Sequence, residues 1–384
     1  MRLAERARTL PPSGIRKFFE LAEARDDVIS LGVGEPDFSA PWAARTAAID
    51  SLERGRTSYT ANRGIAALRE QVAAHHERYG QRYDPETEIV VTTGASEAVD
   101  LAFRALVDPG DVVAVHEPTY ISYRPGIELA GGEPLAVPTR AADDFRLTRE
   151  RLEAAGADAA DLLVLCYPNN PTGAIMDEED LAAVAAFCRE HDVRVIADEI
   201  YAALTYDGEH ASIATQPGMR ERTVVVNGFS KAYAMTGLRL GYALGPADAI
   251  DGMNRIHQYT MLSAPTTAQH AAMAALDRCD GEVREMVDEY NRRRRLVVSR
   301  FNDMGLATFE PKGAFYAFPD CGGDDDRFAE ELLESTGVAV VPGSVFGAGG
   351  KGHLRVSYAT SMRELKEATD RMATFVEEEW EPDR

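Results

Sequence analysis

DLLVLCYPNNPTGAIMDEEDLAAVAAFCREHDVRVIADEIY, residues 161–201, is the stretch that decides the fold. Two short apolar runs, residues 161–165 and 193–197, flank a segment over 178–190 whose apolar residues recur at helical spacing, at Leu181, Val184, Ala185 and Cys188. That spacing predicts an amphipathic helix. Continuous apolar runs are typical of strands buried on both faces of a parallel sheet. The stretch therefore predicts a strand–helix–strand unit.

The same alternation extends outward on both sides of this unit. Further apolar runs lie at residues 88–91, 111–115, 223–226 and 240–244, and helical patterns separate them. Alternating strands and helices predict an α/β sandwich with a mostly parallel sheet.

Past Gly305 the pattern changes from the strand–helix alternation. Residues 282–304 read as one long helix, and short strands are expected at 314–318, 338–341 and 353–357. The run of arginines at 292–295 is expected to be a solvated or salt-bridged helix face. We expect an N-terminal segment over residues 1–45, a large domain over 46–281 and a smaller domain over 282–384.

Charge restricts the class of partner. The chain has 384 residues, 63 acidic and 41 basic side chains, and a net charge of −22. Such a surface repels nucleic acid and anionic lipid, so we expect neither as a partner. There is no run of 18 apolar residues and no apolar N-terminal signal, which predicts a cytoplasmic protein without membrane spans.

Two residue types are scarce. Four scattered cysteines form no C-x-x-C pair, so neither a disulfide framework nor a metal site is expected. Only five lysines occur, at positions 17, 231, 312, 351 and 366. An acidic, lysine-poor surface is typical of proteins in a high-salt cytosol, although a codon bias toward arginine predicts the same composition.

Polar and turn residues follow five of the expected strands, at residues 92–98, 116–120, 167–173, 198–201 and 227–231. In an open α/β sheet, ligands bind beyond the carboxyl ends of the strands. Five such ends on one rim therefore predict a binding site.

The chemistry of these residues is complementary. Ala95 and Ser96 open a helix, whose free amides can hold a phosphate, and Tyr120 offers a ring for stacking. Asp198 follows a buried strand and needs a cation. Together with Lys231, these groups describe a site for pyridoxal phosphate, with the lysine bound to the cofactor's aldehyde.

At this point the sequence resembles a known family. NPTG at 170–173, DEIY at 198–201 and SK at 230–231, followed by Arg239, stand in the order of the class I/II aminotransferases of PLP fold type I. GEPDF at 34–38, Tyr59 and LRVSY at 354–358 extend the resemblance over essentially the whole chain. The stretches GAFY at 313–316 and VPG at 341–343 look most like those of the archaeal-type aspartate and aromatic aminotransferases. The resemblance implies a large domain with a mostly parallel seven-stranded sheet flanked by helices, plus a smaller α+β domain.

The family's roles carry over by motif. Three residues are expected to be catalytic: Lys231 as the proton shuttle, Asp198 as the partner of the pyridine nitrogen, and Tyr201. The cofactor contacts implied are Ala95, Ser96, Ser230 and Arg239 at the phosphate, Tyr120 on the ring, and Asn170 and Tyr201 at the ring hydroxyl. The substrate contacts implied are Gly34, Asn170 and Arg355, with Arg355 on the α-carboxylate. Tyr59 is expected to reach the phosphate of a neighbouring subunit, which implies a homodimer with shared sites.

Several alternatives remain open. Some relatives that bind dicarboxylates carry a lysine where this chain has Ser96, so an aromatic or other neutral amino donor is favoured. Arg16 or Arg63 could still bind the distal carboxylate of aspartate. A carbon–sulfur β-lyase would use the same residues. A DNA-binding regulator of this fold is disfavoured by the short N-terminal segment and the charge. The G-x-G-x-x-G match at 347–352 precedes an expected strand instead of a helix, so it does not indicate a dinucleotide site.

Overall fold

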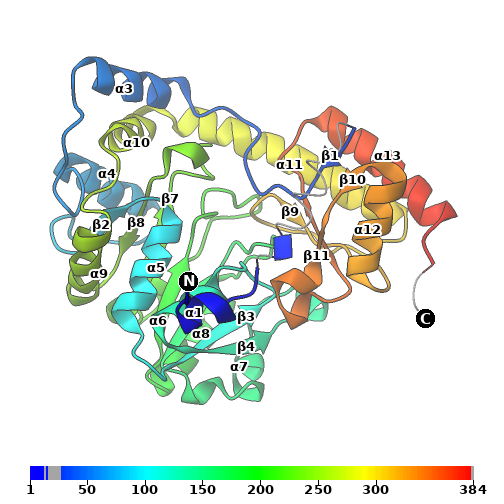
Figure 1. Cartoon of the computed structure of the whole chain (residues 1–384), viewed down its shortest axis with the longest axis horizontal. Helices are drawn as coiled ribbons and strands as arrows, with labels where there is room; N and C mark the ends of the chain where they lie inside the picture. Colours follow the sequence, from blue (N-terminus) through cyan, green and yellow to red (C-terminus); the bar gives the residue numbers. More distant parts are fainter. Residues whose placement is uncertain (13, 16–26, 382–384) are drawn as a thin grey trace.

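The computed structural model describes residues 1–12, 14–15 and 27–381. A seven-stranded sheet lies at its centre (Figure 1), in the order β2-β8-β7-β6-β5-β3-β4. The strands are β2 (Ile89–Thr92), β3 (Val112–Glu117), β4 (Glu133–Pro138), β5 (Leu162–Cys166), β6 (Arg194–Asp198), β7 (Thr223–Gly228) and β8 (Gly241–Leu244). β8 runs opposite to the other six strands, so its pairings with β2 and β7 are antiparallel. The mostly parallel seven-stranded sheet is confirmed.

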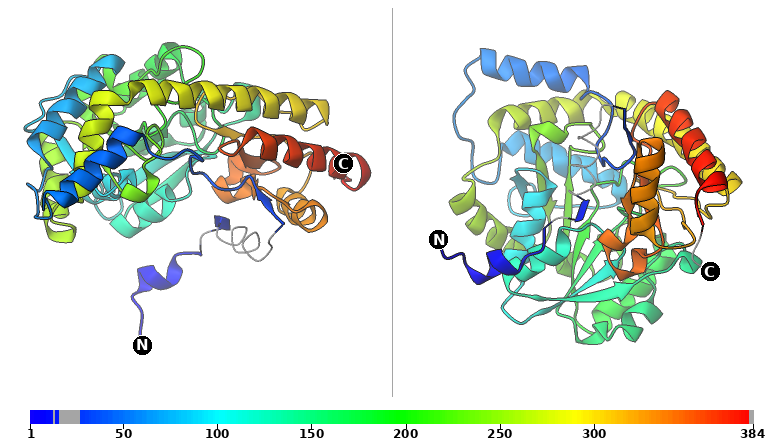
Figure 2. Two further views of the ribbon diagram at one scale, coloured as in Figure 1. Left: turned by 90° about the horizontal axis from the view of Figure 1, so that it is seen from above. Right: turned by 45° about the vertical axis from the view of Figure 1, so that its right-hand side comes forward.

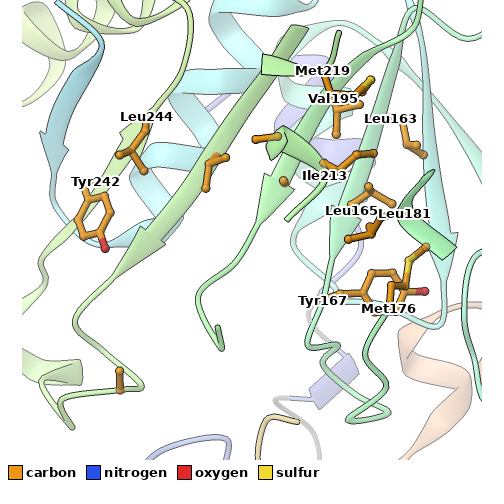
Figure 3. Close-up of a cluster of buried hydrophobic side chains, with 14 of the residues drawn as sticks. Leu163, Leu165, Tyr167, Met176, Leu181, Val195, Ile213, Met219, Tyr242 and Leu244 are labelled. Atoms are coloured by element: carbon orange, nitrogen blue, oxygen red, sulfur yellow. The ribbon is translucent and has the colours of Figure 1, made fainter. Parts of the chain in front are cut away.

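Successive side chains of each strand point to opposite layers. In β6, Val195 and Ala197 join one apolar cluster and Ile196 joins the other. The first cluster is covered by α3 (Trp42–Glu53), α4 (Ala66–His76), α7 (Arg149–Ala154), α8 (Glu178–Glu190) and α10 (Thr266–Arg278). The second is covered by α5 (Ala95–Leu106), α6 (Tyr123–Ala130) and α9 (Ala247–Thr260). Figure 3 shows part of the first cluster, where strand residues such as Leu163 and Leu165 pack with Leu181 of α8.

The helix α8 begins and ends at the predicted residues. Asp177 is the N-cap of this helix, because its carboxylate accepts hydrogen bonds from the amides of Glu179 and Asp180. The Asp180 side chain accepts a bond from the Asp177 amide in return, which completes a capping box. By contrast, the edge strand β4 has no counterpart among the predicted runs. It contains Pro134 and Pro138 and is mostly only partly buried. Proline is tolerated at an edge, but it hides the strand from pattern analysis.

A separate apolar core lies beyond the sheet. It gathers α11 (Asp280–Asp303), α12 (Asp325–Thr336) and α13 (Met362–Glu378) with the short strands β9 (Tyr316–Ala317) and β12 (Leu354–Ser357). The prediction of a single strand at 338–341 is wrong. The chain makes two strands there, β10 (Val338–Ala339) and β11 (Val341–Pro342). They differ because β10 pairs with β1 (Ile29–Ser30), whereas β11 pairs with β12.

The arginine run on α11 is salt-bridged as predicted, but it is not uniformly solvated. Arg293 and Arg294 are 5% and 3% exposed. Arg293 contacts Asp37 at 2.8 Å, and Arg294 contacts Asp207 and Glu310, each at 3.2 Å. The Arg293–Asp37 pair ties the segment containing Gly34 to the long helix.

The N-terminal helix α1 (Glu5–Thr9) buries none of its residues and lies apart from the rest of the chain (Figure 2). In the described part of the chain, no helix is both long and apolar enough to cross a bilayer. No three His, Cys, Asp or Glu side chains of residues 1–12, 14–15 and 27–381 are grouped so that they could hold a metal ion.

Candidate active site

A cavity of about 800 Å³ opens at the carboxyl ends of the parallel strands. Its lining includes nearly all of the residues expected from sequence: Gly34, Ala95, Ser96, Tyr120, Asn170, Asp198, Tyr201, Ser230, Lys231, Arg239 and Arg355. Tyr59 does not line it and is 80% exposed. Its expected role at a neighbouring subunit therefore stays a prediction. Arg16 lies outside the described residues.

One end of the cavity is suited to a phosphate. Gly94, with φ +80°, precedes α5 and has no side chain to cap it, so the first-turn amides of Ala95 and Ser96 are left for an anion. A Cβ at Gly94 would lie 2.8 Å from Nη2 of Arg239. Glycine at this position therefore lets the guanidinium approach the helix N-terminus.

Asp198 is the last residue of β6 and is 6% exposed. Its Oδ2 accepts a hydrogen bond from Tyr123 Oη at 2.7 Å, and its Oδ1 accepts one from the Ile200 amide at 3.1 Å. Burial raises the pKa of the carboxyl to about 6, against the lowering effect of these two donors. Among the described residues, no cation forms an ion pair with it. A protonated ring nitrogen would supply that charge.

This geometry makes a prediction about the cofactor-free protein. A raised carboxyl pKa favours the folded state at low pH, and that stabilisation is lost as pH rises through about 6. Asp198→Asn should therefore raise the free energy of unfolding by about 3 kcal/mol at pH 7.5. The difference from wild type should vanish below about pH 4, near the ordinary carboxyl pKa. Urea unfolding across this pH range measures it, and a constant difference would contradict the assignment.

Lys231 lies in the loop after β7, and its Nζ donates to the Gly34 carbonyl at 2.6 Å. The rings of Tyr201 and Phe315 lie within 5.9 Å of Nζ. Burial, with a further contribution from Arg355, lowers the pKa of the amine to about 8. A substantial neutral fraction near neutral pH is what a nucleophile and proton carrier need.

Arg355 is 3% exposed and lies between the rings of Tyr316 and Phe346, at 4.9 and 4.8 Å. Nη1 donates to Asn170 Oδ1 at 3.1 Å, and Nη2 donates to the Gly32 carbonyl. Its buried Nε has no hydrogen-bond partner in the described part of the chain, and no carboxylate there forms an ion pair with it. Burial lowers its pKa. A guanidinium held in this way calls for an external carboxylate.

Two neighbouring asparagines have different tasks. Asn169 donates to the Pro118 carbonyl and to Thr172 Oγ1, each at 3.0 Å, so it fixes the turn. Asn170 faces Arg355 and the cavity.

Three residues of the site were not found from the sequence. Tyr316 contacts Tyr201 between their hydroxyls at 2.9 Å, and Tyr123 contacts Asp198. Glu35 lines the cavity and accepts from Thr236 Oγ1. The two tyrosines belong to apolar clusters, so their pattern in the sequence is that of core residues.

The donor set fits pyridoxal phosphate. Amides and Arg239 suit a phosphate, the uncompensated Asp198 suits a protonated ring nitrogen, and Lys231 suits an aldehyde. Arg355 remains for the carboxylate of an amino acid.

Comparisons with known proteins agree with this chemistry. The family described as aminotransferase class I and II matches residues 26–372. A putative aminotransferase, YugH, of Bacillus subtilis is 50% identical over 97% of this chain and 98% of its own. An aromatic aminotransferase structure from Pyrococcus horikoshii has a TM-score of 0.90 and 43% identity, covering 94% of this chain and 99% of its own. An aspartate aminotransferase from Thermus thermophilus, solved with maleate, has a TM-score of 0.92 and 39% identity over 97% and 99%. The chain therefore belongs to the class I and II aminotransferases and is a pyridoxal-phosphate-dependent transaminase.

Proposed function

We propose that this aminotransferase moves the amino group of an aromatic or other neutral L-amino acid to a 2-oxo acid, with 2-oxoglutarate as the acceptor, in a ping-pong cycle. The observation that carries the α-amino-acid specificity is Arg355, a buried guanidinium beside Asn170 that forms no ion pair with a described carboxylate. A substrate carboxylate would form a bidentate pair of hydrogen bonds with this guanidinium. The Cα of the substrate would then lie between Arg355 and Lys231.

The residues that would hold the cofactor are divided by its parts. The phosphate would bind the amides of Ala95 and Ser96 with Ser230 and Arg239. Tyr120 would stack on the ring, and Asn170 and Tyr201 would bind its hydroxyl. Bound pyridoxal phosphate supplies an electrophilic aldehyde and an electron-accepting ring. Lys231 Nζ, with a pKa lowered to about 8, would remove the proton from the substrate Cα and deliver it to C4′ of the cofactor.

The preference for a neutral donor rests on the charges in the cavity. The cations among its described lining residues are Lys231, Arg239 and Arg355, and each has a role already. Arg63 bonds to Asp251 at 3.1 Å and to the Thr87 carbonyl at 2.8 Å, and it does not line the cavity. A cation supplied by a partner subunit would let the same cavity accept aspartate. The two solved relatives named above include one aromatic and one aspartate aminotransferase.

The test is the visible spectrum of the holoenzyme as single amino acids are added without a 2-oxo acid. We expect tyrosine and phenylalanine to convert the bound cofactor to its amine form faster than aspartate or glutamate does, and 2-oxoglutarate to restore it. The reverse order of donors would overturn the neutral-donor proposal. Pyruvate and ammonia formed from cysteine-like substrates without an acceptor would instead favour the β-lyase.

We also propose a homodimer with sites shared between subunits. Large apolar side chains are exposed on α3, at the end of α9 and on two loops: Trp42, Ile49, Leu52, Tyr59, Tyr259, Met261 and Leu262. The loops lie side by side, because Asn62 donates to the Leu262 carbonyl at 2.7 Å. An apolar patch of this kind is typical of an interface.

Shared sites predict complementation. Lys231→Ala and Tyr59→Ala should each lose activity, the first almost completely and the second by about tenfold through weaker phosphate binding. In a refolded 1:1 mixture, half of the dimers pair one variant with the other, and each of these holds one intact site. Activity should then recover to about a quarter of wild type per subunit. Recovery no greater than the sum of the two variants would contradict a shared site.

We further propose a cytoplasmic protein adapted to high salt, divided at residues 45 and 281 as expected from sequence. All four cysteines are free and buried, which suits a reducing compartment. The separate apolar core around α11, α12 and α13 supports the division near the start of α11. If carboxylates repel one another at −22, the thermal midpoint should rise steeply between 0.1 and 2 M KCl. A midpoint insensitive to salt would favour the codon-bias explanation.

A further inference from the structure

The floor of the active site contains a tyrosine that touches two parts of the proposed cofactor site. Tyr123 is the first residue of α6 and is fully buried. Its hydroxyl donates to Asp198 Oδ2 at 2.7 Å. Its ring meets the ring of Tyr120 edge to face, with centroids 5.5 Å apart and an interplanar angle of 83°.

The backbone fixes Tyr123 in this position. A Cβ at Gly126, one turn further along α6, would lie 2.9 Å from Phe103 of α5. The absence of a side chain there seats α6 directly on α5, the helix whose N-terminus would hold the phosphate. The residue that contacts Asp198 and Tyr120 is thus carried by a helix that packs on the helix bearing the phosphate amides.

We propose that Tyr123 is a positioning residue, which holds Asp198 ionised and aimed at the pyridine nitrogen while it supports the ring of Tyr120. This rests on the proposed role of Asp198. Within the described ranges, the carboxylate has two protein donors, the Tyr123 hydroxyl and the Ile200 amide. Of these two, only the hydroxyl can be removed by a substitution that leaves the backbone in place.

The other charged and titratable groups around Asp198 do not replace this donor. Cys166, on β5, is its neighbour across the sheet, and burial raises the pKa of that thiol to about 12. Glu199 opposes ionisation of Asp198, and Lys231 favours it without forming an ion pair. Loss of the Tyr123 hydroxyl should therefore raise the pKa of Asp198 further above about 6.

The experiment measures the dissociation constant of pyridoxal phosphate between pH 5 and 8.5 for wild type and Tyr123→Phe. In wild type, affinity should fall below the pH at which Asp198 becomes protonated. In Tyr123→Phe, we expect this fall to begin about one pH unit higher, so that affinity is about threefold weaker near pH 6.5 and about tenfold weaker near pH 5. A role in packing alone would weaken binding equally at every pH.

Tyr290→Phe is the matched control, because Tyr290 is fully buried and its hydroxyl has no hydrogen-bond partner among the described residues. Its pH profile should coincide with that of wild type. In an Asp198→Asn background, Tyr123→Phe should have no further effect on the profile, because the two act through one contact. A parallel or unchanged profile for Tyr123→Phe overturns the inference.

Two results separate this inference from the role on which it rests. If Asp198→Asn binds the cofactor as well as wild type, the role of Asp198 itself is wrong. If Asp198→Asn weakens binding and Tyr123→Phe does not, only the role of Tyr123 is wrong. Should Tyr123→Phe fail to fold, a difluorotyrosine at position 123 supplies a stronger donor, and the fall in affinity should then move to lower pH.

Discussion

Replacing Lys231 by alanine is expected to lower kcat by about 10⁴-fold or more, since one amine serves as both nucleophile and proton carrier. The amine is buried, bonded to the Gly34 carbonyl, and has a pKa lowered to about 8. No other described lysine lines the cavity. Single-turnover mixing of phenylalanine with the cofactor-loaded variant measures the loss.

The control is Lys312→Ala, which removes an exposed lysine outside the cavity. It should leave kcat within about twofold of wild type. Small primary amines added to Lys231→Ala should restore part of the proton transfer, because the cavity left by the side chain can admit them. A variant that retains more than about 1% of wild-type turnover without added amine would show that another group moves the proton.

Replacing Arg355 by methionine is expected to have opposite effects on activity and on stability. Removing the partner of a buried carboxylate costs about 2–5 kcal/mol, so kcat/KM for phenylalanine should fall by about 30-fold to several thousandfold. In the cofactor-free protein, however, the guanidinium is buried without an anion, and its removal relieves a desolvated charge. The midpoint of urea unfolding should therefore stay equal to that of wild type or rise.

Comparing two substrates separates a loss of carboxylate binding from a general loss of activity. Phenethylamine has the side chain of phenylalanine but no carboxylate, so Arg355→Met should lose most of the preference for the amino acid over the amine. Arg295→Met, an exposed change on α11, should alter neither quantity. Equal losses for both substrates would mean that Arg355 does not bind the carboxylate.

Much of this site could be predicted because its residues follow strands. Asp198 and Lys231 stand next to apolar runs that mark β6 and β7, and the carboxyl ends of parallel strands meet at one edge. Arg355 could be assigned only through the family resemblance, since nothing in the spacing places β12 beside the sheet.

The residues that were missed share a physical cause. Tyr123 and Tyr316 are buried aromatic residues whose function is a single hydroxyl contact across long sequence separations. A pattern of apolar residues reports burial but not the partner of one polar atom. The strand β4 and the division at Val340 were missed for a related reason, because pairing with a particular neighbour, and not local composition, decides them.

The uncompensated charges of the cavity have a consequence for the protein in the cell. Asp198 and Arg355 are buried and Lys231 is half-buried, and burial moves the pKa of each toward its neutral form. The newly made chain therefore folds against a penalty, and the vitamin-derived cofactor removes the part that is due to Asp198 and Lys231. A ligand at 100 times its dissociation constant adds about 2.7 kcal/mol to the free energy of unfolding, which is roughly a hundredfold change in the unfolded fraction. Vitamin B6 supply would then set how much of this enzyme escapes proteolysis, before it sets how fast the surviving molecules turn over.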